Sequence, residues 1–395
     1  MRQAHANGVS HASTLTFRAV VRRAARPLFL GAFIALAVSA SCAASEHPKF
    51  QNVRIDNLQL RRDANGEIID AHDGCLKYFD GRYYLYGTGY GKSAGYSISN
   101  RFRVYSSRNL QDWKFDGELL ESPPDGVYYR PYVVHNAITH KYVLWYNWYP
   151  TLWEGKVGVA ISDTPVGPFK IVNRGVEVAG YVDRIGDGSL FVDSDGTGYF
   201  IYTAIGQNHS IRIQRLTPDF LGVTNDTSGV LARGCEAPAL FRNRDRYYAL
   251  FDSTCCFCSS GSGVRVLVAT NPLGPYTEKA NINRKADGGP RVQGQQTFVA
   301  QVLTPAGPAF LWMADRWGSR PDDVKGHDLQ FWSQPLRFTP EGMIEPIENT
   351  SKWSAEIQVG TGEDLVKHSY IWPKKRDPHP LKIDPCTGAP LAEDE

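Results

Sequence analysis

The amino-acid sequence predicts an all-β protein and, within that class, a five-bladed β-propeller. Three observations support this prediction: aromatic residues make up 12% of the 395 residues, a Tyr-rich strand pattern recurs five times, and helical periodicity is nearly absent. Aromatic residues favour strands, and 37 Gly with 24 Pro supply turns throughout the chain. Five copies of a multi-strand unit, without helices to cover a parallel sheet, favour radial repetition around a central channel.

The repeated strands read RYYLYGT, KYVLWYN, GYFIYTA, RYYALFD and AFLWMAD. They begin at residues 82, 141, 198, 246 and 309, so successive starts lie 59, 57, 48 and 63 residues apart. This spacing is near that of propeller blades and is too long for the single strands of a β-sandwich, the main rival architecture. The pair Asp80-Gly81 before the first strand, like Asp195-Gly196 before the third, is typical of a tight hairpin.

The first 45 residues have the order of a secretory signal. Four arginines between residues 18 and 26 precede an apolar stretch from Leu28 to Ala40, and small residues follow through Ser45. The apolar stretch is shorter than the ~20 residues of a transmembrane helix, so we expect a secreted protein, extracellular or periplasmic, with a lipid anchor at Cys42 as the alternative. The propeller should span residues 46–345. Residues 346–395 are polar and proline-rich and should form an extended tail packed on the propeller.

Charge and cysteine content exclude several classes of protein. The net charge of +2 gives no electrostatic basis for binding nucleic acid or an anionic membrane. The run Cys255-Cys256-Phe257-Cys258 lacks a second Cys/His pair at zinc spacing, so structural disulfides are the preferred interpretation. If Cys42 leaves with the signal, the sequence does not choose among the pairings of the six that remain, namely Cys75, Cys235, Cys255, Cys256, Cys258 and Cys386. Cys75 and Cys235 each adjoin or lie near an acidic residue described below, which suggests a disulfide that braces the site.

Three acidic residues stand at matched positions in the repeats. Asp73, Asp187 and Glu236 are each followed by a small residue or proline, an apolar strand, a turn and an aromatic strand. In a propeller these are equivalent points on innermost strands, so the three carboxyl groups should converge on the axis. Asp73 and Asp187 have an alternative interpretation as turn residues, since Asp-Gly is common in turns. Glu236 lies in an apolar string where a lone buried carboxyl group is costly, which favours a functional role.

This layout resembles glycoside hydrolase family 43, whose members are five-bladed propellers that hydrolyse arabinose-, xylose- and galactose-containing polysaccharides with inversion. Asp73 and the pair at residues 83–84 match the spacing of the family's base motif, residues 187–191 look like its modulator motif, and residues 236–238 are similar to its acid motif. Gly74 and Gly188 replace the proline that usually follows the first two acids. The resemblance covers about residues 65–340, and segments such as YYRPYVV, EAPALF and MADRW look closest to the exo-β-1,3-galactanase branch.

The resemblance implies a role for each acid: Asp73 as general base, Glu236 as general acid, and Asp187 as the residue that orients Glu236 and raises its pKa. The galactanase branch typically lacks the base Asp, and Gln295 resembles the Gln of that branch, so Gln295 is an alternative base or water-holder. An inverting hydrolase needs its acid and base about 6.5–9.5 Å apart, so that water fits between them. No cofactor or catalytic metal is required, although a structural cation in the channel is a further expectation.

Other side chains are expected to hold the substrate, although core packing is the alternative for the tryptophans. They are His72, Arg130, Trp145, Trp148, Asp315, Arg316 and Trp317. The sequence thus predicts a secreted, monomeric, inverting glycoside hydrolase for an oligo- or polysaccharide, exo-acting on β-1,3-linked galactan as the first choice. The alternatives are an α-L-arabinofuranosidase or β-xylosidase of the same family, and a non-catalytic carbohydrate-binding propeller.

Overall fold

The computed structural model describes residues 48–151, 153–180, 184–254 and 262–360. Regular structure in these ranges consists of strands and the short 3-10 helices η1 (Ile205–Gln207) and η3 (Lys325–His327). Within the same ranges, no helix has the length and apolar character needed to span a bilayer. The expected signal segment with Cys42, the cysteines at 255, 256, 258 and 386, and most of the expected tail lie outside the described residues.

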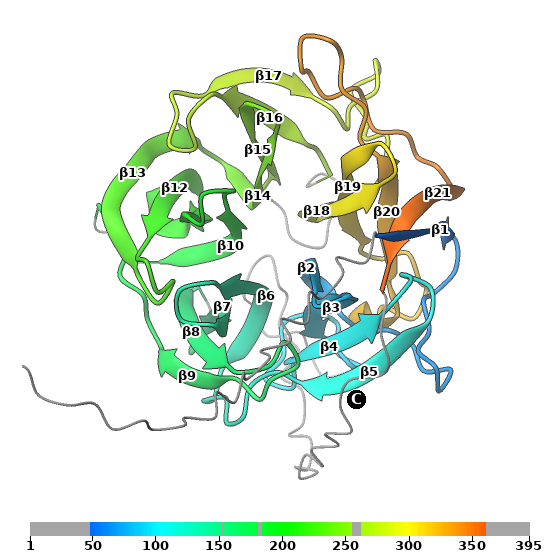
Figure 1. The fold of residues 1–395 in the computed structure, drawn as a ribbon. Helices are drawn as coiled ribbons and strands as arrows, with labels where there is room; N and C mark the ends of the chain where they lie inside the picture. Colours follow the sequence, from blue (N-terminus) through cyan, green and yellow to red (C-terminus); the bar gives the residue numbers. More distant parts are fainter. Residues whose placement is uncertain (1–47, 152, 181–183, 255–261, 361–395) are drawn as a thin grey trace, which may run out of the picture. The chain divides into compact units, whose positions relative to one another are not determined.

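Five antiparallel sheets stand around an axis as the blades of a propeller (Figure 1), which confirms the predicted fold. The first blade contains β2 (His72–Phe79), β3 (Arg82–Gly89), β4 (Arg101–Ser107) and β5 (Trp113–Glu118). The second contains β6 (Val127–Asn136), β7 (Lys141–Tyr149), β8 (Lys156–Ser162) and β9 (Lys170–Asn173). The third contains β10 (Ile185–Val192), β11 (Gly198–Ala204), β12 (Ser210–Leu216) and β13 (Val223–Ala232). The fourth contains β14 (Cys235–Asn243), β15 (Arg246–Ser253), β16 (Arg265–Ala269) and β17 (Thr277–Asn281), and the fifth β18 (Gln295–Thr304), β19 (Gly307–Arg316) and β20 (Leu329–Pro335).

The five aromatic strands recognised in the sequence are the second strands of the five blades, namely β3, β7, β11, β15 and β19. A second strand is paired on both edges, and most residues in these strands are buried. A strand covered on both faces needs a nearly continuous apolar and aromatic run rather than strict alternation. The hairpin between β2 and β3 turns at Asp80 and Gly81 with φ of 47° and 79°, as the Asp-Gly pair predicted.

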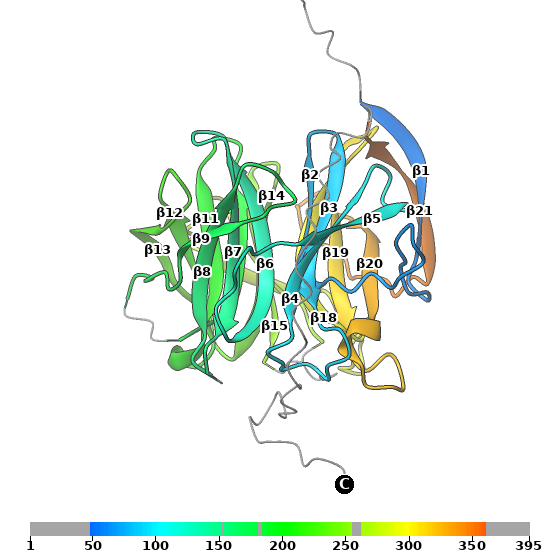
Figure 2. The same cartoon turned by 90° about the horizontal axis from the view of Figure 1, so that it is seen from below.

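The ring of blades closes through its innermost strands and through a pair formed by the two ends of the described chain. Strands β2, β6, β10, β14 and β18 pack in that order, and β18 returns to β2. β1 (Lys49–Asp56) and β21 (Lys352–Val359) pair antiparallel over their whole length. At the end of this pair, the buried Asn57 side chain exchanges hydrogen bonds of 3.0 and 2.9 Å with the main chain of Trp332 in β20. The part of the expected tail that is described therefore includes a strand joined to β1 (Figure 2).

The predicted disulfide between Cys75 and Cys235 is wrong, because both residues are buried free thiols. Cys75 lies on β2 of the first blade and Cys235 on β14 of the fourth, and these blades are not neighbours in the ring. The Sγ atom of Cys235 instead lies 3.3 Å from the guanidinium group of Arg265. Each cysteine is close to a predicted acid in the sequence, but this did not place the two cysteines close to each other.

Candidate active site

The site lies where the innermost strands begin, and each of these strands is irregular at that point. The pairing register between first and second strands shifts once in every blade, between His72 and Cys75, Tyr129 and Tyr132, Ile185 and Gly188, Glu236 and Ala239, and Gln296 and Phe298. An extra residue in one strand bends it locally and re-aims its side chains. The backbone is left-handed at Asp73, Arg130 and Ala237, with φ of 49°, 54° and 52°. The irregularities therefore turn polar side chains toward the axis.

The two glycines that depart from the family's proline pattern belong to these irregular segments. A Cβ atom on Gly74 would lie 1.9 Å from the carbonyl oxygen of Tyr86, and one on Gly188 would lie 2.5 Å from the ring of Phe200. Neither position has room for a side chain without movement of its neighbour. The glycines thus allow the first and third innermost strands to approach their second strands closely.

A pocket with an empty volume of about 690 Å³ opens at this end of the channel and brings the three predicted acids together. Asp73, Asp187 and Glu236 all line it, as do the predicted residues Arg130, Gln295 and Trp317. Residues that the sequence did not single out complete the wall; these are Tyr90, Tyr96, Tyr129, Tyr149, Trp153, Gly186, Thr203, Ile205 and His209. Three carboxyl groups and a strongly aromatic wall therefore share one pocket.

The carboxylate of Asp73 is buried and held by three donors. Its Oδ1 accepts hydrogen bonds from Thr88 Oγ1 at 2.6 Å and from the backbone N–H of Arg130 at 3.2 Å. Its Oδ2 accepts one from Tyr90 Oη at 2.6 Å. Burial raises the pKa of Asp73 to about 6, although Arg130 and the two hydroxyl groups oppose that effect. Asp73 is thus ionised at neutral pH, as a general base must be.

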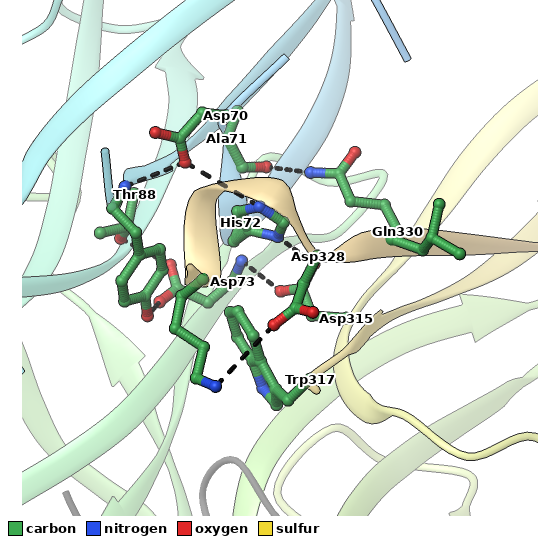
Figure 3. A network of polar contacts seen from close by, with 12 residues as sticks. Asp70, Ala71, His72, Asp73, Thr88, Asp315, Trp317, Asp328 and Gln330 are labelled. Atoms are coloured by element: carbon green, nitrogen blue, oxygen red, sulfur yellow. Dashed lines mark hydrogen bonds and ion pairs between the residues drawn. The ribbon is translucent and has the colours of Figure 1, made fainter. Parts of the chain in front are cut away.

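Behind Asp73 lies a chain of buried charges (Figure 3). The backbone N–H of Asp73 donates to Asp315 Oδ2 at 2.6 Å, and Asp315 Oδ1 lies 2.9 Å from His72 Nδ1. His72 Nε2 faces Asp70 at 3.9 Å, and Asp70 also pairs with Arg103. Burial acts to lower the pKa of His72, but Asp315 and Asp70 outweigh it and raise the pKa to about 9. His72 is therefore a buried cation that holds Asp315 against the backbone of Asp73.

Arg130 connects Asp73 to the two other acids. Its Nη2 donates to Asp187 Oδ2 at 3.0 Å, and its Nη1 donates to the carbonyl oxygen of Gln296 at 3.1 Å. Asp187 Oδ2 also accepts from the backbone N–H of Ala237 at 3.0 Å. Asp187 is therefore fixed against the residue that follows Glu236. Arg130 acts here as a partner of carboxylates, with 6% of its side chain exposed.

Glu236 has a partner that the sequence did not reveal, His209 of the third blade. His209 Nδ1 lies 3.1 Å from Glu236 Oε1, in contact but not aligned as a hydrogen bond. Burial raises the pKa of Glu236; the contact with His209 opposes this shift, and the charge of Asp187 adds to it. In the sequence His209 belongs to the sequon-like Asn208-His209-Ser210, a pattern unrelated to acid–base chemistry. No local signal places it beside an acid whose strand begins 26 residues later.

Gln295 is oriented by Trp317, because Trp317 Nε1 lies 2.9 Å from Gln295 Oε1. An indole N–H can only donate, so the partner atom is the amide oxygen. The rest of the wall is aromatic. The centroid of the Tyr129 ring lies 6.1, 6.5 and 5.8 Å from the ring centroids of Tyr90, Tyr96 and Tyr149. Tyr129 lies in the YYRPYVV segment, but a tyrosine in a Tyr-rich chain gives no signal that separates pocket from core.

Five of the predicted substrate-binding residues do not line the pocket. Trp145 is buried and donates from Nε1 to the carbonyl oxygen of Phe220 at 2.8 Å, while Trp148 donates to that of Arg174 at 2.8 Å. Both are packing residues, because they are buried and their indole groups are bonded to main-chain carbonyl groups outside the pocket. His72 and Asp315 lie one layer behind the wall, with 1% and 2% exposure. Arg316 is also absent from the wall.

The described residues contain no group of three His, Cys, Asp or Glu side chains placed to hold a metal ion. A cation in the channel therefore stays a prediction from the sequence. The chemistry available within the described pocket is that of carboxyl groups, a guanidinium group, an imidazole, an amide and hydroxyl groups. This set is suited to moving protons between a bound molecule and water.

Fold and site together define a class of protein: a five-bladed propeller with three carboxyl groups in a pocket at the start of its innermost strands. The chain belongs to glycosyl hydrolases family 43, whose family model matches residues 68–302. The fold is similar to that of a family 43 β-1,3-galactosidase solved with galactodeoxynojirimycin, with 25% identity, a TM-score of 0.67 and coverage of 76% of this chain and 99% of that one. It is also similar to an exo-β-1,3-galactanase from Clostridium thermocellum, with 26% identity, a TM-score of 0.66 and coverage of 77% and 68%.

Curated relatives match over shorter stretches. A 1,2-β-oligomannan phosphorylase from Thermoanaerobacter sp. (strain X514) is 25% identical over 183 residues, which cover 46% of this chain and 57% of that protein. An arabinoxylan arabinofuranohydrolase from Paenibacillus polymyxa is 22% identical over 267 residues, with coverage of 54% and 40%. The chain thus spans about half the length of the curated relatives it matches. The names of both proteins refer to carbohydrate substrates.

Proposed function

We propose that the protein is an inverting, exo-acting glycoside hydrolase that removes single sugars from β-1,3-linked galactan or a related galactose-containing chain. The observation that carries this proposal is that two carboxyl groups share one pocket but have different surroundings. Three donors stabilise the ionised form of Asp73, whereas burial and the charge of Asp187 raise the pKa of Glu236. Two carboxyl groups whose surroundings push their pKa values apart are suited to act as base and acid.

In the proposed reaction Glu236 gives its proton to the glycosidic oxygen as the bond from that oxygen to the anomeric carbon breaks. Asp73 takes a proton from a water molecule, whose oxygen forms the new bond to the anomeric carbon from the opposite face. Asp187 acts on Glu236 through its charge and through its hydrogen bond to the neighbouring backbone. The amide oxygen of Gln295 accepts a hydrogen bond from Trp317, which leaves the NH₂ group as a donor. A donor can hold water or a sugar oxygen but does not accept a proton, which supports a holding role for Gln295.

The choice of galactan is supported by the two solved relatives, at 25% and 26% identity, that are described as a β-1,3-galactosidase and an exo-β-1,3-galactanase. The aromatic wall supports a sugar ligand, since sugar rings present flat, partly apolar faces to aromatic side chains. We further propose that the protein is exported, on the evidence of residues 1–45 of the sequence. An α-L-arabinofuranosidase or β-xylosidase of the same family is the alternative to be separated by assay.

The test compares β-1,3-galactan with aryl β-galactoside, α-L-arabinofuranoside and β-xyloside, using wild-type protein and the variants Glu236→Gln and Asp73→Asn. Loss of the acid should lower turnover of galactan by several orders of magnitude, but much less for an aryl glycoside whose leaving group needs no proton. Loss of the base should lower both. Glu278 is exposed on the outermost strand β17 and pairs with Arg265 of β16, so Glu278→Gln supplies the control.

Proton NMR of the sugar released by the wild type reports its first anomer. An α-anomer from a β-linked substrate supports inversion, and a β-anomer refutes it. Binding of sugars without release across the whole panel would instead support a carbohydrate-binding propeller.

A further inference from the structure

His209 is held beside Glu236 by the backbone, not only by its own side chain. The backbone N–H groups of Gly234 and Cys235 donate to the carbonyl oxygens of Asn208 and His209 at 3.0 and 3.1 Å. These bonds join the β11–β12 connection of the third blade to the first residue of β14. Glu236 is the next residue in that strand. The contact between imidazole and carboxyl group is therefore built across two blades.

The backbone at this connection is also unusual. Asn208 and His209 both have left-handed conformations, with φ of 57° and 44°. Such a conformation costs a residue with a side chain roughly 1–2 kcal/mol and persists where the surroundings determine it. His209 thus adopts a backbone conformation that Asn or Gly would adopt with less strain. Its side chain is 26% exposed and lines the pocket, so it reaches both solvent and Glu236.

We propose that His209 and Glu236 hold one proton in common, so that the general acid of this site is the pair rather than the carboxyl group alone. The proposal rests on the proposed function of the site. In the singly protonated pair the proton resides on Glu236 Oε1 or Oε2 or on His209 Nδ1, and the form with the proton on Glu236 reacts. Its proton moves to the leaving oxygen, which also keeps the electrons of the broken bond, and the pair takes up another proton from water.

The charges around the pair favour this arrangement. Contact with Glu236 raises the pKa of His209, and burial raises that of Glu236, with Asp187 raising both. Arg184 opposes the shift at His209, and Arg130 opposes it at Glu236. Groups that interact in this way lose protons in steps that belong to the pair. The pair keeps its last proton to a higher pH than Glu236 would alone, because that proton can reside on either of two sites.

The experiment measures kcat/KM against pH on a substrate that needs acid catalysis, for wild type, His209→Asn and His209→Gly. Asn and Gly tolerate the left-handed backbone, which keeps the connection intact. The limb at high pH should move down by about one unit and activity on the plateau below it should rise about tenfold, because the proton is no longer divided between two sites, while the limb at low pH stays. Added imidazole should return the limb of His209→Gly toward the wild-type pH. His327→Gln is the control, since His327 pairs with Asp322 at 2.8 Å outside the pocket.

A second measurement needs no turnover. The ring of His209, followed by NMR titration, should show a lower pKa in Glu236→Gln than in wild type. An unchanged His209 pKa, or a high-pH limb that stays in place in both His209 variants, would overturn the shared proton. If the His209 variants are inactive, the titration alone decides. If the wild type hydrolyses nothing in the panel, the proposed function fails, and the titration still reports whether the two groups interact.

Discussion

Replacement of Tyr90 by Phe tests whether Asp73 is the base. The change removes the 2.6 Å hydrogen bond from Tyr90 Oη to Asp73 Oδ2 and leaves the ring in place. A hydrogen bond to a charged group contributes about 1.5–3 kcal/mol, and 1.4 kcal/mol corresponds to about one pKa unit. Because the hydroxyl group stabilises the ionised form, its loss should raise the pKa of Asp73 from about 6 to about 7–8.

The base must be ionised to act, so the low-pH limb of kcat/KM should move up by about 1–2 units in Tyr90→Phe. At pH 6 this corresponds to a loss of roughly 5- to 50-fold, which should disappear at high pH. The control is Tyr86→Phe in the same blade, where the lost hydroxyl group donates to the carbonyl oxygen of Pro165. A limb that stays within about 0.3 units of the wild type would show that Asp73 is not the base. Gln295 would then be the group to replace next.

Three further predictions concern the parts of the fold that support the site. Gly74→Ala should destabilise the protein by about 1–3 kcal/mol in a denaturant titration, because its Cβ would meet the Tyr86 carbonyl group, whereas Gly175→Ala has open space and should have little effect. Asn57→Ala should cost about 2–3 kcal/mol, since it removes both bonds to Trp332; an unchanged midpoint would show that the β1–β21 pair is held without them. His72 has a pKa of about 9 in the fold against an ordinary 6.5, so its contribution of about 3 kcal/mol is present below pH 6.5 and is lost as pH rises through 9. The free energy of unfolding should fall over that range in wild type, and His72→Gln, with no proton to lose, should show a smaller fall.

The fold was accessible from the sequence because each second strand is covered on both faces and must be aromatic or apolar throughout. The three acids were accessible because each opens an innermost strand, where the order of small residue, strand and turn repeats. Trp145 and Trp148 were misassigned, since a tryptophan in such a strand has the same local pattern whether it faces the axis or a neighbouring blade. His209 could not be found, because it reaches Glu236 through hydrogen bonds between two blades.

The register shift in every innermost strand has a consequence for how this pocket can change. Each blade presents its axial side chain from a short irregular segment, while the paired residues on either side keep the sheet intact. Some of these segments also make bonds between blades, such as Arg130 to the Gln296 carbonyl group and the Ala237 N–H to Asp187, so a substitution there alters the pocket and the contacts between blades together. Deletion of the extra residue should restore regular pairing in that strand and remove its axial side chain from the pocket.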